Sequence, residues 1–237
     1  MLIVDAGGDP PDPASIERVV AALRDGSVVA VPTDTVYGLA VDPWQPAAVA
    51  QLFAVKERPT TVPLPVLVAG WEQVDSLAGR LEPAAAQLVD RYWPGPLTLV
   101  VPRVDSFVAD LGGPPSARAT VGLRWPDHPA MAALCAALGP LAVTSANRHG
   151  AAPATTVAEV ERQFVGGKDP RAEGSGAAGL SVLLDGGRCT GTPSTVVECH
   201  GRSVQCLRDG ALPFARLAAE LVPTGPEGIS YDQGGSG

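Results

Sequence analysis

The chain has 237 residues, of which 46% are hydrophobic and 18% are charged, as is ordinary for a globular protein. Its 27 glycines and 24 prolines predict many turns, but they are too few and too irregular for a disordered or collagen-like chain. The formal net charge of −8 argues against a broad nucleic-acid-binding surface, because such a surface needs clustered lysine and arginine.

Hydrophobic periodicity predicts helices and strands that alternate along the chain. In chain order, we expect a helix at Ile16–Leu23, a strand at Val28–Val31, a helix at Ala47–Val55, a strand at Leu64–Val68, a helix at Pro83–Tyr92, strands at Leu97–Val101 and Thr120–Arg124, a helix at Pro129–Leu138, a strand at Leu141–Thr144, a helix at Val157–Phe164, strands at Ser181–Leu184, Thr195–Cys199 and Ser203–Leu207, and a helix at Phe214–Leu221. This interleaving predicts one α/β domain with a mixed sheet. We place the domain at residues 15–222, after an N-terminal extension at 1–14 and before a flexible tail at 223–237 that is rich in glycine and proline.

No segment of the chain resembles a targeting or membrane-spanning sequence. Residues 1–13 carry acids and prolines and lack the basic and apolar regions of a signal peptide. The longest apolar runs, such as Leu97–Val101, have the length of a strand and are too short to cross a membrane. The four cysteines (Cys135, Cys189, Cys199 and Cys206) show no CxxC spacing. We therefore expect reduced thiols and a cytoplasmic location.

Three familiar patterns carry no function here. Gly174–Gly179 matches GxGxxG, but it lacks the preceding strand and the following helix of a dinucleotide site, so we expect a loop. Gly166–Asp169 lacks the spacing of a Walker phosphate loop and is expected to be a turn. The histidines (His128, His149 and His200) are scattered, and no spacing predicts a bound metal ion.

Four polar segments lie at the ends of predicted elements, where ligands collect in α/β sheets. They are Pro32–Leu39, Lys56-Glu57-Arg58-Pro59, the strand ending at Arg124, and Thr144-Ser145-Ala146-Asn147. Each also has a purely structural explanation: a capped turn, cations that complement a helix dipole, an arginine that reaches solvent, and turn-forming side chains. Taken singly, each segment is compatible both with ligand binding and with a purely structural role.

Taken together, the segments resemble the YrdC family, from about Ser15 to Leu221. The matching pieces, in the family's order, are PTDTVYGL at Pro32–Leu39, KxR at Lys56 and Arg58, WPGPLT at Trp93–Thr98, GLR-x-P at Gly122–Pro126, SxN at Ser145 and Asn147, PSTVV at Pro193–Val197 and LRDG at Leu207–Gly210. The resemblance implies a twisted mixed sheet with helices around a positively charged central cavity. It also implies the synthesis of threonylcarbamoyl-AMP and pyrophosphate from L-threonine, bicarbonate or CO₂ and ATP, for the N6-threonylcarbamoyl modification of adenosine 37 in tRNA.

The resemblance also assigns roles to residues. Threonine contacts are expected from Thr35, Arg124 and Ser194, and ATP contacts from Lys56, Arg58, Thr120, Ser145, Asn147, Thr155 and Arg208. Within the second set, Lys56, Arg58, Ser145 and Asn147 are the expected catalytic residues. Mg²⁺ is expected to accompany the triphosphate. The product would be handed to the tRNA threonylcarbamoyl-transfer machinery, without stable binding of nucleic acid by this chain.

The sequence departs from the family at two positions. Leu67 stands where larger two-domain members carry a histidine, and His149 replaces a small residue after SxN. Two other functions stay open at this point. One is a related enzyme that forms a carbamoyl-adenylate or acts as a carbamoyltransferase, and the other is a non-catalytic RNA-binding or ribosome-maturation module.

Overall fold

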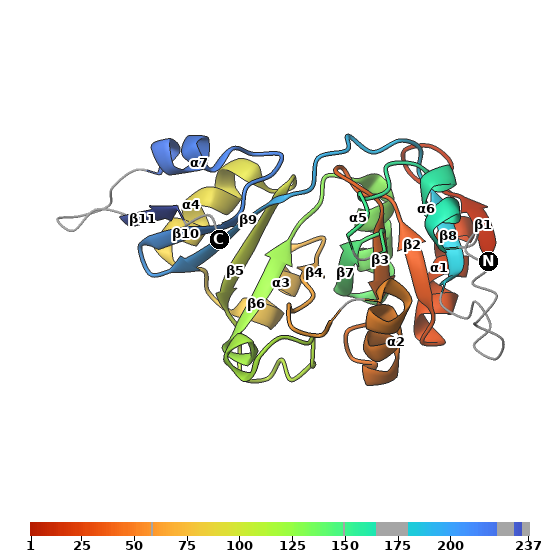
Figure 1. The fold of residues 1–237 in the computed structure, drawn as a ribbon, viewed down its shortest axis with the longest axis horizontal. Coiled ribbons are helices and arrows are strands. Elements are labelled where there is room, and N and C mark those ends of the chain that lie inside the picture. The colour runs from red at the N-terminus through yellow and green to blue at the C-terminus, as the bar shows by residue number, and fades with distance from the viewer. Residues whose placement is uncertain (58, 149, 165–179, 222–229, 234–237) are drawn as a thin grey trace.

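The strands form one mixed sheet. The computed structural model describes residues 1–57, 59–148, 150–164, 180–221 and 230–233. Eleven strands pair in the order β1-β8-β2-β3-β7-β4-β6-β5-β9-β10-β11 (Figure 1). Both parallel and antiparallel pairs occur, as in β2 with β8 and β2 with β3. The mixed α/β fold predicted from the sequence is therefore confirmed.

The elements have the following bounds. The strands are β1 (Leu2–Asp5), β2 (Val28–Val31), β3 (Gly38–Val41), β4 (Val66–Leu67), β5 (Leu97–Pro102), β6 (Thr120–Arg124), β7 (Leu141–Ser145), β8 (Leu180–Asp185), β9 (Thr195–His200), β10 (Ser203–Arg208) and β11 (Ser230–Gln233). The helices are α1 (Pro13–Arg24), α2 (Pro46–Lys56), α3 (Trp71–Ala78), α4 (Pro83–Tyr92), α5 (Pro129–Leu138), α6 (Val157–Phe164) and α7 (Phe214–Glu220), with a short 3₁₀ helix at Pro115–Ala119.

Four helices begin at a proline: α1, α2, α4 and α5 start at Pro13, Pro46, Pro83 and Pro129. Proline suits the first helical position because its fixed φ is helical and its missing N–H is not needed there. The bounds predicted for β2, β6, α4, α5 and α6 are confirmed, and the other predicted elements differ from the observed ones by a few residues.

The sheet has two halves with different surroundings. The first half contains β1, β8, β2, β3 and β7, and hydrophobic clusters cover both faces of β2. Along β2, Val28 and Ala30 belong to one hydrophobic cluster, whereas Val29 and Val31 belong to a second cluster with α1 and α5. A strand that is buried on both faces must be apolar at every position, and β2 is.

The second half contains β4, β6, β5, β9, β10 and β11, and its core lies on one side. Helices α3, α4 and α7 contribute apolar side chains to the cluster that also holds Leu97, Leu99 and Val197. Helix α7 is joined to α4 by hydrogen bonds from Arg91 and Tyr92 to Glu220. The other face of these strands is therefore left for a cavity.

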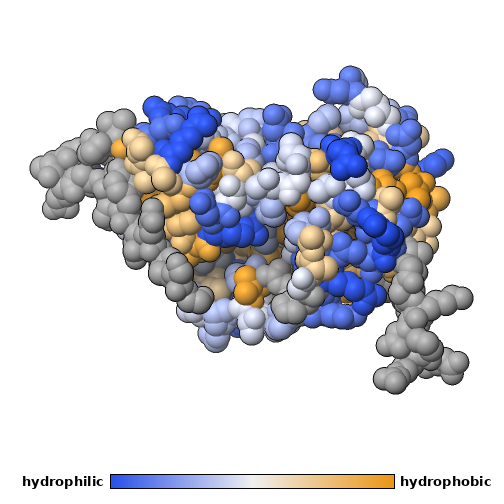
Figure 2. Space-filling model, turned by 45° about the horizontal axis from the view of Figure 1, so that its top comes forward, coloured by the Kyte–Doolittle hydropathy of each residue, from blue (hydrophilic) through white to orange (hydrophobic). Residues whose placement is uncertain are grey.

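The sequence analysis missed β1, β3, α3, β11 and the short 3₁₀ helix. Strand β1 lies within the predicted N-terminal extension and pairs with β8 at the edge of the sheet. Its Leu2 and Ile3 are exposed, and Figure 2 shows hydrophobic surface at the end of the molecule where β1 lies. Strand β11 lies within the predicted tail and pairs with β10. The domain boundaries at residues 14/15 and 222/223 stay predictions.

Strand β4 is shorter than expected, with two residues in place of the five predicted at Leu64–Val68. Pro65 has no N–H to donate to a ladder, so regular pairing starts only at Val66.

Of the described helices, none has the length and apolar composition needed to cross a membrane. All four cysteines are free thiols, as expected.

His128 begins helix α5 and links its stability to pH. Its Nδ1 accepts a hydrogen bond from the Ala130 N–H at 3.2 Å, an interaction that requires an unprotonated nitrogen. Burial lowers the pKa of His128 below its ordinary value of 6.5, although the nearby Asp34, Asp127 and Asp9 oppose the shift. Because the unfolded chain then binds the proton more tightly, stability should fall as the pH drops below about 6.5.

We expect His128→Asn to remove this part of the pH dependence. Asparagine keeps an N-cap acceptor but does not titrate. Urea unfolding at pH 7.5 and 5.5 should therefore show a smaller loss of unfolding free energy in His128→Asn than in the wild type. The control is His200→Asn, at an exposed histidine, which should keep the wild-type dependence. If His128→Asn and the wild type lose the same unfolding free energy between pH 7.5 and 5.5, then His128 does not cause the pH dependence.

Candidate functional site

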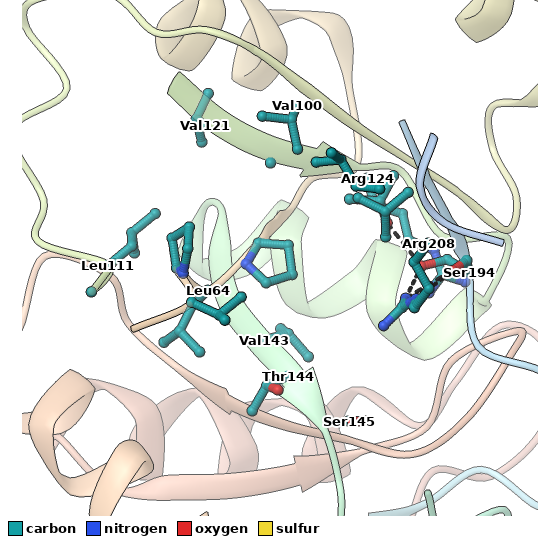
Figure 3. A pocket seen from close by; sticks show the side chains of 18 of the residues that line it. Leu64, Val100, Leu111, Val121, Arg124, Val143, Thr144, Ser145, Ser194 and Arg208 are labelled. Atoms are coloured by element: carbon teal, nitrogen blue, oxygen red, sulfur yellow. Dashed lines mark hydrogen bonds between the residues drawn. The ribbon is translucent and has the colours of Figure 1, made fainter. Parts of the chain in front are cut away.

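A cavity of about 760 Å³ lies between the two halves of the sheet. Its volume is within the range of about 300–1,000 Å³ that is typical of ligand pockets. The first half contributes the turn after β2, the end of α2 and the end of β7, and the second half contributes β4, β5, β6, β9 and β10. Figure 3 shows Arg124, Arg208 and Ser194 close together on one side, with Leu64 and Leu111 away from them.

Alternation along three strands builds the floor of the cavity. The residues that face it are Thr98 and Val100 on β5, Thr120, Gly122 and Arg124 on β6, Val196 and Glu198 on β9, and Ser194 directly before β9. Neighbouring residues such as Leu99, Leu123 and Val197 are buried in the hydrophobic core. Because side chains of a strand alternate between its faces, polar residues can line the cavity without disturbing the core.

The turn between β2 and β3 carries two buried threonines. Thr33 Oγ1 donates to the Val36 carbonyl at 2.7 Å and accepts from the Thr35 and Val36 N–H groups. Its hydroxyl also lies 3.0 Å from Thr35 Oγ1. Thr33 therefore shapes the turn, and Thr35, which is also buried, is held at the cavity wall.

Arg124 ends β6 and is 6% exposed. Its Nε donates to the Gly95 carbonyl at 3.1 Å, its Nη1 to Thr35 Oγ1 at 2.9 Å and its Nη2 to Asp34 Oδ1 at 2.5 Å. Burial lowers the pKa of Arg124, and the charge of Arg208 adds to this, whereas the Asp34 carboxylate raises it. The buried guanidinium thus has three acceptors within the protein. The purely structural explanation, in which Arg124 reaches solvent, is therefore wrong.

Ser194 lies between a threonine and an arginine. Its Oγ is 2.9 Å from Thr98 Oγ1, and it accepts from Arg208 Nη2 at 3.1 Å. Arg208 also donates from Nε and Nη2 to the Ser194 carbonyl, at 3.1 and 2.7 Å. These contacts place a second guanidinium near Arg124, and they create a basic region on this side of the cavity (Figure 3).

Lys56 forms a second polar cluster with the end of β7. Its Nζ donates to Thr144 Oγ1 at 3.0 Å, to Ser145 Oγ at 3.0 Å and to Asn147 Oδ1 at 3.2 Å, and also to the Ser145 carbonyl at 2.6 Å. Ser145 Oγ donates to Asn147 Oδ1 at 2.6 Å. The predicted catalytic residues Lys56, Ser145 and Asn147 are therefore in direct contact.

Asn147 is held from its other side. Its Nδ2 donates to the carbonyls of Arg148 and Ala151, at 3.0 and 2.8 Å. Arg148 in turn pairs with Glu57, the residue after Lys56, which adopts a left-handed backbone with φ of 53°. The end of α2 and the segment after β7 therefore support one another, and both present polar groups to the cavity.

Most of the predicted site residues line this cavity. Those that do are Thr35, Lys56, Thr120, Arg124, Ser145, Asn147, Ser194 and Arg208. Arg58 lies outside the described residues, and so do His149 and both glycine-rich patterns in 165–179. Leu67, the first departure from the family pattern, also lines the cavity.

Thr155 does not belong to this lining. Its backbone N–H and its hydroxyl both bond to the Glu159 carboxylate, at 2.6 and 2.9 Å, beside the start of α6. Arg188 also donates to its hydroxyl at 3.4 Å. In this structure Thr155 supports the helix terminus, and its predicted ATP contact stays a prediction.

Thr98 and Thr144 are among the polar lining residues that received no role in the sequence analysis. Thr98 lies within the WPGPLT motif, and its place between Leu97 and Leu99 is a period-two signal for a polar face. Thr144 precedes SxN on an otherwise apolar strand, but no local pattern indicates that Lys56 lies beside it. That contact joins residues 88 positions apart in the chain.

The lining favours anions over protein-bound metal ions. Within the described part of the chain, it contains five basic residues (Lys56, Arg103, Arg118, Arg124 and Arg208) and one acidic residue, Glu198. Among the described residues, no group of three His, Cys, Asp or Glu side chains could hold a metal ion. Hydroxyl, amide and cationic groups of this kind suit carboxylate and phosphate oxygens.

Comparison with known proteins gives the same family along most of the chain. The Sua5_yciO_yrdC family model, described as "Telomere recombination", matches residues 21–210. A putative threonylcarbamoyl-AMP synthase of Mycobacterium tuberculosis is 36% identical over 207 residues, which cover 87% of this chain and 88% of the relative. The threonylcarbamoyl-AMP synthase of Bacillus subtilis is 34% identical over 211 residues, covering 88% of this chain and 57% of the relative.

Solved structures show the same fold. Sua5 of Pyrococcus abyssi, in complex with L-threonine, is similar with a TM-score of 0.79 and 29% identity, over 98% of this chain and 63% of that one. Escherichia coli YciO has a TM-score of 0.70 over 89% of this chain and 95% of that one, and at 21% identity it supports the fold alone. This chain spans less than two thirds of the Sua5 and B. subtilis proteins.

The site depends on a close backbone contact at Gly210. A Cβ atom there would lie 2.5 Å from the Pro193 carbonyl oxygen and 2.7 Å from that of Ser194, the acceptor of Arg208. We expect Gly210→Ala to destabilise the protein by about 1–3 kcal/mol, because backbone atoms must move apart. Urea unfolding measures this. Gly8→Ala is the control, since its Cβ would meet nothing within 4 Å, and equal stabilities would contradict the prediction.

Proposed function

Because the chain belongs to the Sua5/YciO/YrdC family, we propose that it is a threonylcarbamoyl-AMP synthase. It would convert L-threonine, bicarbonate or CO₂ and ATP to threonylcarbamoyl-AMP and pyrophosphate, with release of water when bicarbonate is the carbon source. The observation that carries the proposal is one cavity that joins two cationic clusters, one around Arg124 and one around Lys56. An amino-acid carboxylate and a triphosphate are two anions that need two such clusters.

The cluster around Arg124 is assigned to threonine. A guanidinium can bind a carboxylate with two parallel N–H groups, which gives orientation as well as affinity. Thr35 and Ser194 present hydroxyl groups on either side of the same region. The L-threonine complex of P. abyssi Sua5, a structure with which this chain superposes along 98% of its length, supports this assignment.

The cluster around Lys56 is assigned to the phosphates of ATP. Lys56, Ser145 and Asn147 form a compact group with an ammonium, a hydroxyl and an amide, all of which can donate to phosphate oxygens. Arg58, assigned by its place in the KxR motif, would add a second cation. Thr120 and Arg208, which are also assigned to ATP, line the same cavity. The apolar wall of Leu64, Leu111 and Val121 (Figure 3) suits the adenine ring.

The reaction needs positioning and charge stabilisation more than it needs covalent catalysis. The threonine amine combines with bicarbonate to give a carbamate and water. A carbamate oxygen then attacks the α-phosphorus in line, the bond to the bridging oxygen breaks, and pyrophosphate leaves. Lys56 and Arg58 would stabilise the negative charge that develops on pyrophosphate, while Arg124 holds the threonine carboxylate away from it.

Mg²⁺ is proposed to enter with ATP. The cavity lining has one acidic side chain, Glu198, so the donor set does not provide a metal cage of carboxylates. Mg²⁺ in nucleotide enzymes is commonly held by phosphate oxygens and water with only one or two protein ligands. When bound, it would neutralise phosphate charge, in addition to the lysine and arginine side chains. The product would pass to the tRNA threonylcarbamoyl-transfer machinery, and a cytoplasmic location fits this role.

The decisive experiment measures pyrophosphate release from ATP with Mg²⁺ and bicarbonate, with and without L-threonine. We expect release to depend on threonine and to yield a product with the mass of threonylcarbamoyl-AMP. A third reaction contains carbamoyl phosphate in place of threonine and bicarbonate. Release in that reaction alone would reject the proposed substrates and favour a carbamoyl-adenylate enzyme.

Lys56→Met tests the phosphate cluster. Methionine keeps much of the apolar stem but removes the ammonium that contacts Ser145 and Asn147. We expect threonine-dependent pyrophosphate release to fall on the order of tenfold to a thousandfold, as it does when comparable electrostatic donors are lost. Arg162→Met is the matched control, because Arg162 is exposed on α6 and should be replaceable without loss.

A melting curve for each variant separates loss of charge from loss of fold. If folded Lys56→Met retains activity within twofold of the wild type, then Lys56 does not stabilise the reaction. If Arg162→Met loses as much activity as Lys56→Met, the effect of removing a cation is not specific to the cavity.

A further inference from the structure

Asp34 is the acidic partner of the arginine assigned to threonine, and no role has been given to it above. It follows Thr33 in the turn after β2, and its Oδ1 accepts from Arg124 Nη2 at 2.5 Å. The side chains of both residues are largely buried, at 14% and 7% exposed. A buried ion pair of this kind leaves an uncompensated charge when one partner is removed, so Asp34 strongly affects where Arg124 lies.

The hydrogen bonds of Arg124 leave two donors for a ligand. A guanidinium has five N–H groups, and within the described part of the chain Gly95, Thr35 and Asp34 use one on each of Nε, Nη1 and Nη2. One N–H therefore remains on each terminal nitrogen. Two donors on adjacent nitrogens match the two oxygens of a carboxylate.

The backbone of Asp34 is itself held in place. Thr190 Oγ1 donates to the Asp34 carbonyl at 2.9 Å, and the Gly191 N–H donates to the Thr35 carbonyl at 2.8 Å. Both donors come from the segment between β8 and β9, which crosses from one half of the sheet to the other (Figure 1). The carboxylate thus occupies a defined position before any ligand binds.

We propose that Asp34 is a positioning residue for amino-acid recognition: it orients the Arg124 guanidinium so that its two remaining N–H groups bind the carboxylate of the amino-acid substrate. This inference rests on the proposed function for the identity of that substrate. Asp34 also compensates the charge of a guanidinium that lies near Arg208. Without it, two cations of like charge would face one another across the cavity wall.

The test is Asp34→Asn, which retains the size of the side chain and one acceptor oxygen but removes the charge. We expect the KM for L-threonine to rise about tenfold to a hundredfold, the range for losing well-placed hydrogen bonds to a charged group. The KM for ATP and the kcat should stay within about threefold of the wild type, because the cluster around Lys56 is untouched. A general structural lesion would instead lower kcat and raise both KM values.

Two further variants complete the experiment. Asp34→Glu keeps the charge and moves it by one methylene, so it should raise the KM for threonine less than Asp34→Asn does. It also serves as the test if Asp34→Asn fails to fold. Asp42→Asn is the matched control, since among the described residues this carboxylate accepts from Trp44 and Gln45, near the end of β3, and it should behave as the wild type.

An unchanged KM for threonine in folded Asp34→Asn would overturn the inference while leaving the proposed function intact. An equal rise in the KM for ATP would also overturn it, because the effect would not be specific to the amino acid. If the wild type shows no threonine-dependent pyrophosphate release, the proposed substrate fails and this inference fails with it.

Discussion

Two buried cations, Lys56 and Arg124, constrain the site more than any other groups in the chain. A charged side chain that leaves water needs polar partners within the protein, and the penalty for lacking them is several kcal/mol. Lys56 finds its oxygens at the end of β7, and Arg124 finds its oxygens in the turn after β2 and at Gly95. The hydroxyl and amide side chains at these strand ends thus stabilise the fold and also surround a space for anions.

The same strands serve the core and the cavity because their side chains alternate. On β5, Leu97 and Leu99 pack in the hydrophobic cluster, whereas Thr98 and Val100 face the cavity. A substitution at Leu99 is therefore expected to act on stability, while one at Thr98 acts on the hydroxyl pair with Ser194. Strand β2 differs because apolar helices and loops cover both of its faces, so none of its own residues lines the cavity.

Local sequence patterns were enough to predict the elements with strong periodicity, such as β2, β6, α4 and α5. They failed for β3, whose small apolar residues follow directly on a turn motif, and for α3, which has eight residues and no side-chain cap. The motifs identified residues of the site, but they did not identify the residues to which those side chains bond. The contact of Lys56 with Thr144 depends on how α2 packs against β3, which lies beside β7 in the sheet, and no local pattern encodes it. Thr155 shows the reverse case, because this expected ATP contact bonds to a carboxylate at a helix terminus.

The turn after β2 shows why the motifs of this chain are spread along its whole length. Asp34 and Thr35 bond to Arg124, about 90 residues later, and their carbonyls accept from Thr190 and Gly191, about 155 residues later. Arg124 becomes available to the turn only when the two halves of the sheet pack together. The geometry around Arg124 is thus a product of tertiary structure. It follows that a substitution in the segment between β8 and β9 can alter the site without touching a ligand, because that segment holds the backbone to which Arg124 is tied.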